Sequence, residues 1–391
     1  MSRILPSWLQ RWLLSLLSLS LCIMTTGCWS AYEIQQVDYA KAIGIEYKDG
    51  MYHIYVQTLD FSSIAKSDNS GKTAEAPPIW VGHAQGKTMS LAINELWRAS
   101  QLHIAWGHVT AIVMAESVLN TRHIKDVFDM LGRFPEARYT TWVYGTREPL
   151  LNILSTASIY NLSPLDSILH NPLPSYMENS LFAPVLSFEL IAKHNDPATT
   201  TYLPVIALNK DLWLQNKKEH DLFLIEGAYF ERMGEKFNFL SRDELSGYHW
   251  LIKGMRRAPL LVQKNDVIYG ALSVGLPTIK IEPIIRGEKV TFRIDAKYLT
   301  ALYEYLVPMT YDEMTRLSEA KLKEQIMQTY QNGLKKGVDV YGLQEKLYRK
   351  NPKLWHKLSG DGENLILTED SIETLNIHLT IPYTGKYKRK V

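Results

Sequence analysis

The chain has 391 residues, of which 43 are lysine or arginine and 41 are aspartate or glutamate, so its formal net charge at pH 7 is +2. This balance excludes the strong basic excess that a nucleic-acid partner would call for. Hydrophobic residues make up 46% of the chain, which suffices for the folded cores of roughly two or three domains.

The start of the chain has the order of a secretory signal. Two arginines and no acidic residue open it, residues 12–24 are mostly leucine, and three small residues then lead to Cys28. The apolar stretch is 13 residues long, whereas a membrane-spanning helix needs roughly 20. This order predicts a signal peptide over residues 1–27, cleaved between Gly27 and Cys28.

A cysteine at the cleavage point predicts a lipoprotein. The thiol of Cys28 would accept diacylglycerol, and Gly27 is small enough for the peptidase to cut beside it. Two or three acyl chains on one residue meet the requirement for stable anchoring. We expect Trp29, next to the lipid, to lie at headgroup depth, where an indole is favoured. The alternative is an ordinary cleaved signal with an incidental cysteine.

Residues 28–37 then form the lipidated N-terminus and a tether. Cys22 and both arginines leave with the signal, so the mature net charge is near zero and Cys28 is the only remaining cysteine. A disulfide within the chain and a cysteine-based metal site are therefore excluded. Residues 30–37 span less than roughly 30 Å at about 3.5 Å each, which keeps the folded body close to the membrane.

Residues 38–147 alternate strand and helix signals and predict an N-terminal α/β domain. Two strands at residues 41–46 and 52–57 are joined by a turn at Asp49 and Gly50. The elements expected next are a polar loop at 67–76, an extended segment at 78–81, a helix carrying Met89, Ile93, Leu96 and Trp97 behind a Thr88 cap, a strand at 108–114, a helix at 124–131 ending at Gly132, and a strand at 139–144.

Residues 148–258 predict a middle α+β domain. Its expected elements are a helical segment at 149–160, breaks at Pro164, Pro172 and Pro174, a helix at 181–193, and a hairpin of strands at 221–230 and 236–240.

Residues 259–391 predict a C-terminal α/β domain with a long helix. Thr310 and Glu313 have the capping-box spacing that would start this helix, and Gly337 is placed to end it. Its expected inner face consists of Leu322, Ile326, Tyr330 and Leu334, and the expected strands lie at 266–274, 278–283, 290–296 and 375–382.

No catalytic, cofactor-binding or metal-binding pattern is recognisable. His103 and His108 are five residues apart around Trp106, which fits neither one face of a helix nor a zinc site. Four acidic residues within 361–370 are typical of a solvated surface. The basic residues at 386–390 indicate either contact with anionic lipid or a frayed terminus.

Segments spread over the whole chain resemble one known family. They are GCW at residues 27–29 with AIGIE at 42–46, IEGAYF at 225–230 with LSRDELSGYHWL at 240–251, and VDVYGLQEKLYRKNPKLW at 338–355. The last of these is the most specific. In these segments the chain is similar to the Ger(x)C family, the C-subunit lipoproteins of GerA-type nutrient germinant receptors from endospore-forming bacteria.

The resemblance implies a role and no reaction. It implies a three-domain lipoprotein on the outer face of the cell or inner spore membrane, beside the A and B integral-membrane subunits of a receptor. It also implies that the protein is no enzyme but an interaction module, which contacts the bilayer through diacylglycerol on Cys28. Ser30 and Gln344 depart from the family's pattern and leave open which receptor it serves.

Two other hypotheses remain at this point. One is an extracytoplasmic solute-binding lipoprotein of an importer, although such proteins usually have two large similar lobes. The other is a lipid-anchored hydrolase of spore peptidoglycan, which lacks a recognisable catalytic set.

Overall fold

The computed structural model describes residues 6–24, 37–59, 78–120, 122–134, 136–232 and 234–383. The chain divides into two units, Met1–Val37 and Asp38–Val391. The first unit contains α1 (Ser7–Met24), which covers the apolar stretch of the predicted signal. Among the described residues, no helix combines the length and the apolar character needed to cross a bilayer.

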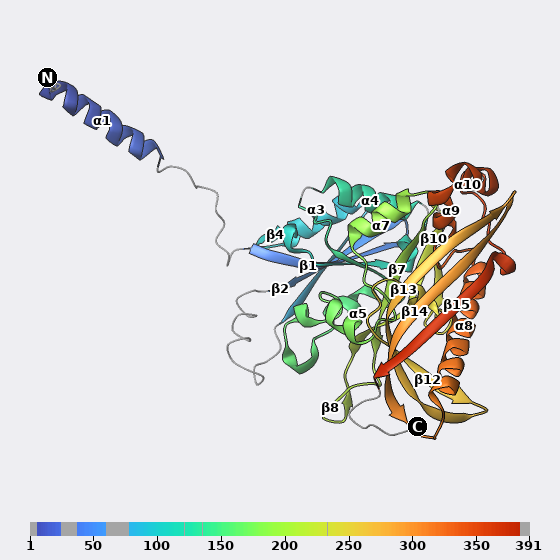
Figure 1. Ribbon diagram of the computed structural model, residues 1–391. Coiled ribbons are helices and arrows are strands. Elements are labelled where there is room, and N and C mark those ends of the chain that lie inside the picture. Colours follow the sequence, from blue (N-terminus) through green and yellow to red (C-terminus); the bar gives the residue numbers. More distant parts are fainter. Residues whose placement is uncertain are drawn as a thin grey trace, which may run out of the picture. The chain divides into compact units, whose positions relative to one another are not determined.

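The larger sheet of the second unit mixes parallel and antiparallel strands (Figure 1). β1, β5, β6 and β7 are parallel, whereas β1–β2, β2–β3, β7–β10 and β10–β11 pair antiparallel. Asp49 and Gly50 have the positive φ angles, 52° and 78°, that a tight hairpin turn requires, as predicted. Within the described part of the chain the order is β11 (Asn238–Ser241), β10 (Leu222–Arg232), β7 (Thr200–Asn209), β6 (Trp142–Thr146), β5 (Ala111–Ala115), β1 (Val37–Lys48), β2 (Met51–Leu59) and β3 (Ile79–Gly86), with β4 (His103–Ala105) paired to β1.

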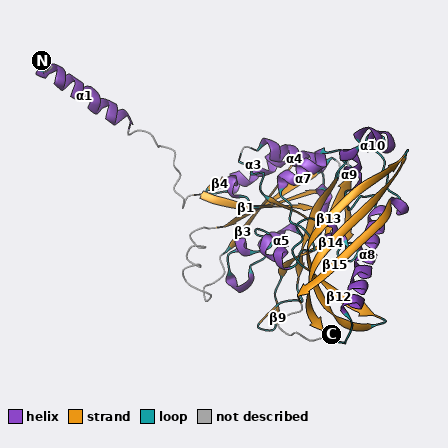
Figure 2. Ribbon diagram, in the orientation of Figure 1, coloured by secondary structure: helices purple, strands orange, loops and turns teal. Residues whose placement is uncertain are grey.

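Helices lie against both faces of this sheet. Figure 2 shows α3 (Met89–Ala99), α4 (His123–Arg133) and α7 (Ser187–Asn195) on one side and α5 (Leu150–Ser155) on the other. The hydroxyl of Thr88 accepts a hydrogen bond from the backbone N–H of Leu91 at 3.3 Å, which confirms the predicted cap of α3. The predicted apolar stripe is buried at Ile93 and Leu96, but Trp97 is exposed.

The smaller sheet has the order β12 (Ala258–Lys264), β13 (Val267–Arg286), β14 (Lys289–Tyr305), β15 (Ile372–Tyr383). α8 (Tyr311–Lys335) packs against β12 and β15. Its predicted ends are confirmed: the hydroxyl of Thr310 accepts from the N–H of Glu313 at 3.2 Å, and Gly337 has φ 71°. The buried residues of α8 include Leu322, Ile326 and Tyr330, three of the predicted inner face.

The remaining elements are short. They are η2 (Trp106–His108), η3 (Glu116–Val118), η4 (Ile159–Asn161), η5 (Pro164–Asp166), α6 (Leu173–Glu178), β8 (Leu214–Gln215), β9 (Lys218–Glu219), η6 (Tyr248–Leu251), α9 (Leu343–Lys350), α10 (Pro352–Ser359) and η7 (Glu369–Ser371). One hydrophobic cluster joins the two sheets and contains Ile45, Met114, Tyr229, Trp250, Phe292 and Trp355. The predicted fold class, mixed sheets flanked by helices, is confirmed.

The helix predicted over 181–193 begins only at Ser187. The preceding residues are extended because their backbone pairs with β6: the N–H of Val143 donates to the carbonyl of Val185 at 3.0 Å, and Leu186 bridges to Trp142. Pro184 also interrupts any helix there. The helical segment predicted over 149–160 is likewise shorter and ends at Ser155.

β7, which lies in the interior of the larger sheet, was not predicted from the sequence. Pro204 stands within it, and proline normally marks an edge strand or no strand at all. Smaller errors concern strand limits: residues 108–110 precede β5, and residues 139–141 precede β6. The two strands predicted at 266–274 and 278–283 are one strand, β13, with a register shift between Gly275 and Thr278.

The larger sheet takes strands from both sides of the predicted boundary at 147 and 148, and the smaller sheet begins at Ala258. The domain limits 38–147, 148–258 and 259–391 stay a prediction.

Candidate functional site

The predicted processing and anchoring residues Gly27, Cys28 and Trp29 lie outside the described residues, as do the loop at 67–76 and the basic residues at 386–390. The anchor therefore stays a prediction from the sequence.

The two histidines considered as metal ligands lie in different elements. His103 is in β4, whereas His108 closes η2 and packs edge to face on Tyr39, with 5.0 Å between ring centroids. Within the described ranges, histidine, cysteine and acidic side chains form no group of three that could hold a metal ion. The acidic residues are also dispersed: Oδ1 of Asp361 accepts a hydrogen bond from Nδ1 of His356 at 2.7 Å, while Glu369 and Asp370 belong to η7.

A polar pocket of about 330 Å³ lies at the end of the larger sheet where β1 finishes. The carboxyl ends of parallel strands are a common place for ligand sites in α/β proteins. Its walls come from the β1–β2 hairpin and from the first turns of α3 and α4, and are formed by Tyr47, Tyr52, Lys87, Thr88, Met89, Ser90, Arg122, His123, Asp126 and Asp129.

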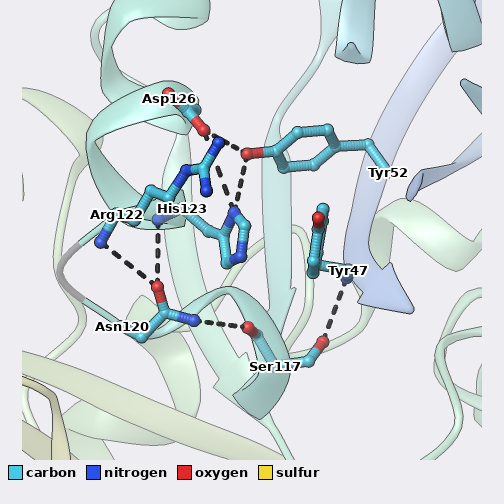
Figure 3. Close-up of polar contacts among 7 residues, drawn as sticks. All are labelled: Tyr47, Tyr52, Ser117, Asn120, Arg122, His123 and Asp126. Carbon is cyan, nitrogen blue, oxygen red and sulfur yellow. Dashed lines mark hydrogen bonds and ion pairs between the residues drawn. The ribbon is translucent and has the colours of Figure 1, made fainter. Parts of the chain in front are cut away.

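The hydrogen bonds of this pocket define one proton arrangement (Figure 3). The hydroxyl of Tyr52 donates to Oδ2 of Asp126. The same hydroxyl lies 2.9 Å from Nδ1 of His123 and, because its own proton goes to Asp126, accepts a hydrogen bond from that nitrogen. The ring of Tyr47 stacks on His123 with 3.7 Å between centroids. Asn120 Oδ1 accepts from the backbone N–H of His123 at 3.0 Å and caps α4.

Burial and neighbouring groups shift the pKa values of two side chains in this pocket. Burial raises the pKa of Tyr52, and the hydrogen bond to Asp126 raises it further, so the phenol stays protonated. Burial lowers the pKa of His123, with Asp126 opposing and Arg122 adding to the change. The hydrogen bonds of the cluster fix the start of α4 against the hairpin.

This cluster of Tyr52, His123 and Asp126 could not be predicted from the sequence. Tyr52 and His123 are 71 residues apart, and neither belongs to a motif with fixed spacing. Only the fold brings them together.

A wider groove of about 680 Å³ lies near the end of β7 and the β8–β9 hairpin. Its lining combines aromatic residues and prolines with a few charged groups, and includes Tyr144, Tyr176, Phe182, Pro184, Pro204, Trp213, Phe223, Glu226 and Arg242. Burial raises the pKa of Glu226, while Arg147 lowers it. The lining also includes Ser175, Ser241 and Asp243, and among the described residues neither a histidine nor a cysteine contributes to it.

The most specific family segment, residues 338–355, is an internal scaffold. Tyr341 is buried, and its hydroxyl lies 3.1 Å from the carbonyls of both Gly247 and Ile326, which links this segment to η6 and α8. Gly247 also belongs to a family segment. A Cβ there would be 2.2 Å from the carbonyl oxygen of Gln325, so only glycine permits the close approach.

Other residues of the same segment act as local supports. Asp339 is buried, and its Oδ2 accepts from the N–H of Gln344 at 2.7 Å, which caps the start of α9. Burial raises the pKa of Asp339, against the lowering effect of backbone N–H groups. Gln344, a departure from the family's pattern, is buried and accepts from the N–H of Ile366 at 3.2 Å. Trp355, a residue of α10, is buried in the hydrophobic core.

Comparisons with known families match nearly the whole chain. A family model described as "Spore germination protein N-terminal domain" matches residues 30–208, and one described as "Spore germination B3/ GerAC like, C-terminal" matches residues 225–381.

Individual known proteins agree with these matches. The chain is 23% identical over 398 residues to spore germination protein KC of Bacillus subtilis (strain 168), covering 93% of this chain and 94% of that protein. It is 21% identical over 401 residues to spore germination protein YndF of the same organism, covering 94% and 95%. The crystal structure of the GerBC protein superposes with a TM-score of 0.52 at 14% identity, over 90% of this chain and 99% of that one, and so shows a shared fold.

Proposed function

Because the chain belongs to the GerAC family of spore germination proteins, we propose that it is the lipid-anchored C subunit of a nutrient germinant receptor. In this role it is a non-catalytic interaction module on the outer face of the cell or inner spore membrane. The observation that carries the proposal is the pair of family matches, which begin at residue 30 and reach residue 381.

The attachment to the membrane is part of the proposal. The small residue Gly27 before Cys28 supports cleavage there, and acylation of Cys28 supplies the anchor. We propose Trp29 as an additional contact at headgroup depth. The folded unit starts at Asp38, so few residues separate it from the lipid.

The proposed partners are the A and B integral-membrane subunits of the receptor. The short predicted tether, residues 30–37, supports this choice of partners. It holds the folded body within roughly 30 Å of the bilayer and so raises the body's effective concentration near membrane-embedded proteins.

Deletion of the gene, followed by germination assays with single nutrients, tests the receptor role. We expect the response to at least one nutrient to be lost and to return when the gene is restored. A normal response to every nutrient, in a strain that also lacks related C subunits, would contradict the proposal.

Replacement of Cys28 by alanine tests the anchor. We expect the Cys28→Ala protein to fold but to lose both its acyl mass and its support of germination. Cys22→Ala is the matched control, because this cysteine lies in the apolar core of the signal and should be dispensable. If the Cys28→Ala strain germinates normally, positioning by the lipid is wrong.

The importer hypothesis gains no support from the comparisons. Calorimetry of the ectodomain with amino acids and sugars would test it directly, because a solute-binding protein should give heats of binding at micromolar ligand.

A further inference from the structure

One end of the larger sheet is defined by the start of β1, where the chain enters the folded unit. The parallel strands β5 and β6 also start at this end. Backbone bonds align them: the N–H of Thr110 donates to the carbonyl of Lys41, and the N–H of Trp142 donates to the carbonyl of Thr110, each at 2.9 Å. β4 lies beside the start of β1 (Figure 1).

Five large apolar side chains from separate segments are exposed at this end. Their exposed fractions are 68% for Trp80, 45% for Trp97, 40% for Leu102, 56% for Tyr139 and 46% for Phe188. We call these five residues the tether-end rim. Single exposed apolar residues are ordinary on a protein surface. These five share one property, which is that all of them lie at the end of the sheet where the chain enters the folded unit.

Strand and turn pairing places each residue of the rim. Trp80 pairs with Thr58, which pairs with Ala40 close to the start of β1. Leu102 immediately precedes β4, which pairs with β1. The N–H of Phe188 donates to the carbonyl of Tyr139 at 3.1 Å, just before β6.

The glycines of β3 show that Trp80 and Trp97 lie at the same end of α3. A Cβ at Gly86 would meet the backbone of Ala92, at the start of α3, whereas a Cβ at Gly82 would meet Leu96, near its end. α3 therefore runs antiparallel to β3. Trp80, two residues before Gly82, is on the same face of the strand and points toward the last turn of α3, which carries Trp97.

The position of the tether indicates what the rim contacts. If Cys28 is acylated, as the proposed function holds, the few residues before Asp38 join this end of the sheet directly to the bilayer. Tryptophan and tyrosine are the side chains that favour the headgroup region, since they combine an apolar ring with a polar atom. We propose that the tether-end rim rests in the headgroup region of the anchoring membrane and so fixes the orientation of the whole ectodomain.

Charged side chains of both signs lie near the rim: Lys41 and Arg138 are close to His108, and Glu136 accepts a hydrogen bond from the backbone N–H of Trp106 at 3.0 Å. Next to Trp97, Arg98 is paired with Glu95 at 2.6 Å. The contact therefore depends on burial of aromatic rings and not on attraction to anionic lipid. It should be insensitive to salt, in contrast to a polybasic membrane contact.

The test uses the chain from Cys28 onward, because residues 38–391 form a compact unit of their own. Cys28 is its only cysteine and can be coupled to maleimide-headgroup lipid in phosphatidylcholine vesicles. Trp29 is replaced by phenylalanine so that it contributes no fluorescence to the measurement. Lipids brominated near the headgroup then quench those tryptophans that touch the bilayer.

We expect quenching that falls at least about twofold in the W80A/W97A variant. Trp213→Ala is the matched control: Trp213 is also exposed, but it lies beyond the carboxyl end of β7, at the opposite end of the sheet. Absence of quenching in the parent, or equal quenching in parent and W80A/W97A, would overturn the proposal and would leave the rim as a contact for protein. Strong loss of quenching at high salt would also contradict it.

Because the attachment in this experiment is chemical, its outcome does not depend on acylation in the cell. Failure of the rim and failure of the lipid anchor are therefore separate results.

Discussion

The family segment at 338–355 and the tether-end rim differ in how they are encoded and in what they contact. The segment is one continuous stretch, and its side chains Tyr341, Gln344 and Trp355 are buried against other parts of the same chain. The rim is assembled from five separate segments and points into solvent. Such a difference is expected where a motif preserves packing, since buried residues are constrained by many neighbours at once. The recognisable motif therefore does not identify the surface through which this protein makes its contacts.

The largest effect on stability is expected inside the family segment. Trp355→Ala removes a fully buried indole and should lower the free energy of unfolding by about 3–5 kcal/mol. Urea unfolding of the chain from Cys28 onward measures this. The control Trp213→Ala removes an exposed indole and should change the value by less than about 0.5 kcal/mol. A loss below about 1 kcal/mol for Trp355→Ala would show that the segment is not a structural support.

The elements with strong local signals could be predicted from the sequence. The β1–β2 turn, the Thr88 cap of α3 and both ends of α8 depend on neighbouring residues only, so their chemistry is visible in a short window. β7 could not be predicted in this way, because Pro204 contradicts the rule for interior strands and only its pairing with β10 explains it.

The candidate sites also divide into those with a local sequence signal and those that only the fold brings together. Cys28 could be predicted because processing enzymes read a short linear pattern, and it stays a prediction. The Tyr52–His123–Asp126 cluster and the tether-end rim were not found, because their members meet only through strand order and helix direction. Trp97 illustrates the limit: its spacing suggested an inward face of α3, yet it is exposed beside Trp80.

A second prediction concerns the scaffold beneath the rim, where His170 is buried. Its Nε2 donates to Oε1 of Gln57 at 2.9 Å and its Nδ1 lies 2.6 Å from the hydroxyl of Thr110. The amide of Gln57 is oriented by its bond to the carbonyl of Leu154, which makes Oε1 the acceptor. Burial, together with a smaller effect of the charge on Lys41, lowers the pKa of His170 to about 3.

Acid should therefore destabilise this scaffold. Since the folded pKa lies below the unfolded value of about 6.5, the stabilisation is complete above pH 6.5 and is lost as the pH falls toward 3. Between pH 7 and pH 5 the loss from His170 is about 2 kcal/mol. In urea titrations, His170→Gln should reduce this pH dependence, whereas His378→Gln, an exposed control on β15, should keep it. Equal pH dependence in all three proteins would contradict the assignment.

The smallest effect on stability, combined with a loss of function, is expected at the rim. Trp80→Ala together with Trp97→Ala removes exposed rings, so the free energy of unfolding should change by less than about 0.5 kcal/mol. Germination in a strain carrying both substitutions should nevertheless slow by about twofold or more, because a body that is anchored but not oriented meets its partners less often. Immunoblotting of the membrane fraction checks that the protein is present in normal amount.

Leu91→Ala is the matched control, since Leu91 is exposed on the same helix but lies at its other end. Normal germination of the double variant, with Leu91→Ala also normal, would mean that the lipid on Cys28 alone positions the ectodomain and that the exposed rings serve no membrane contact.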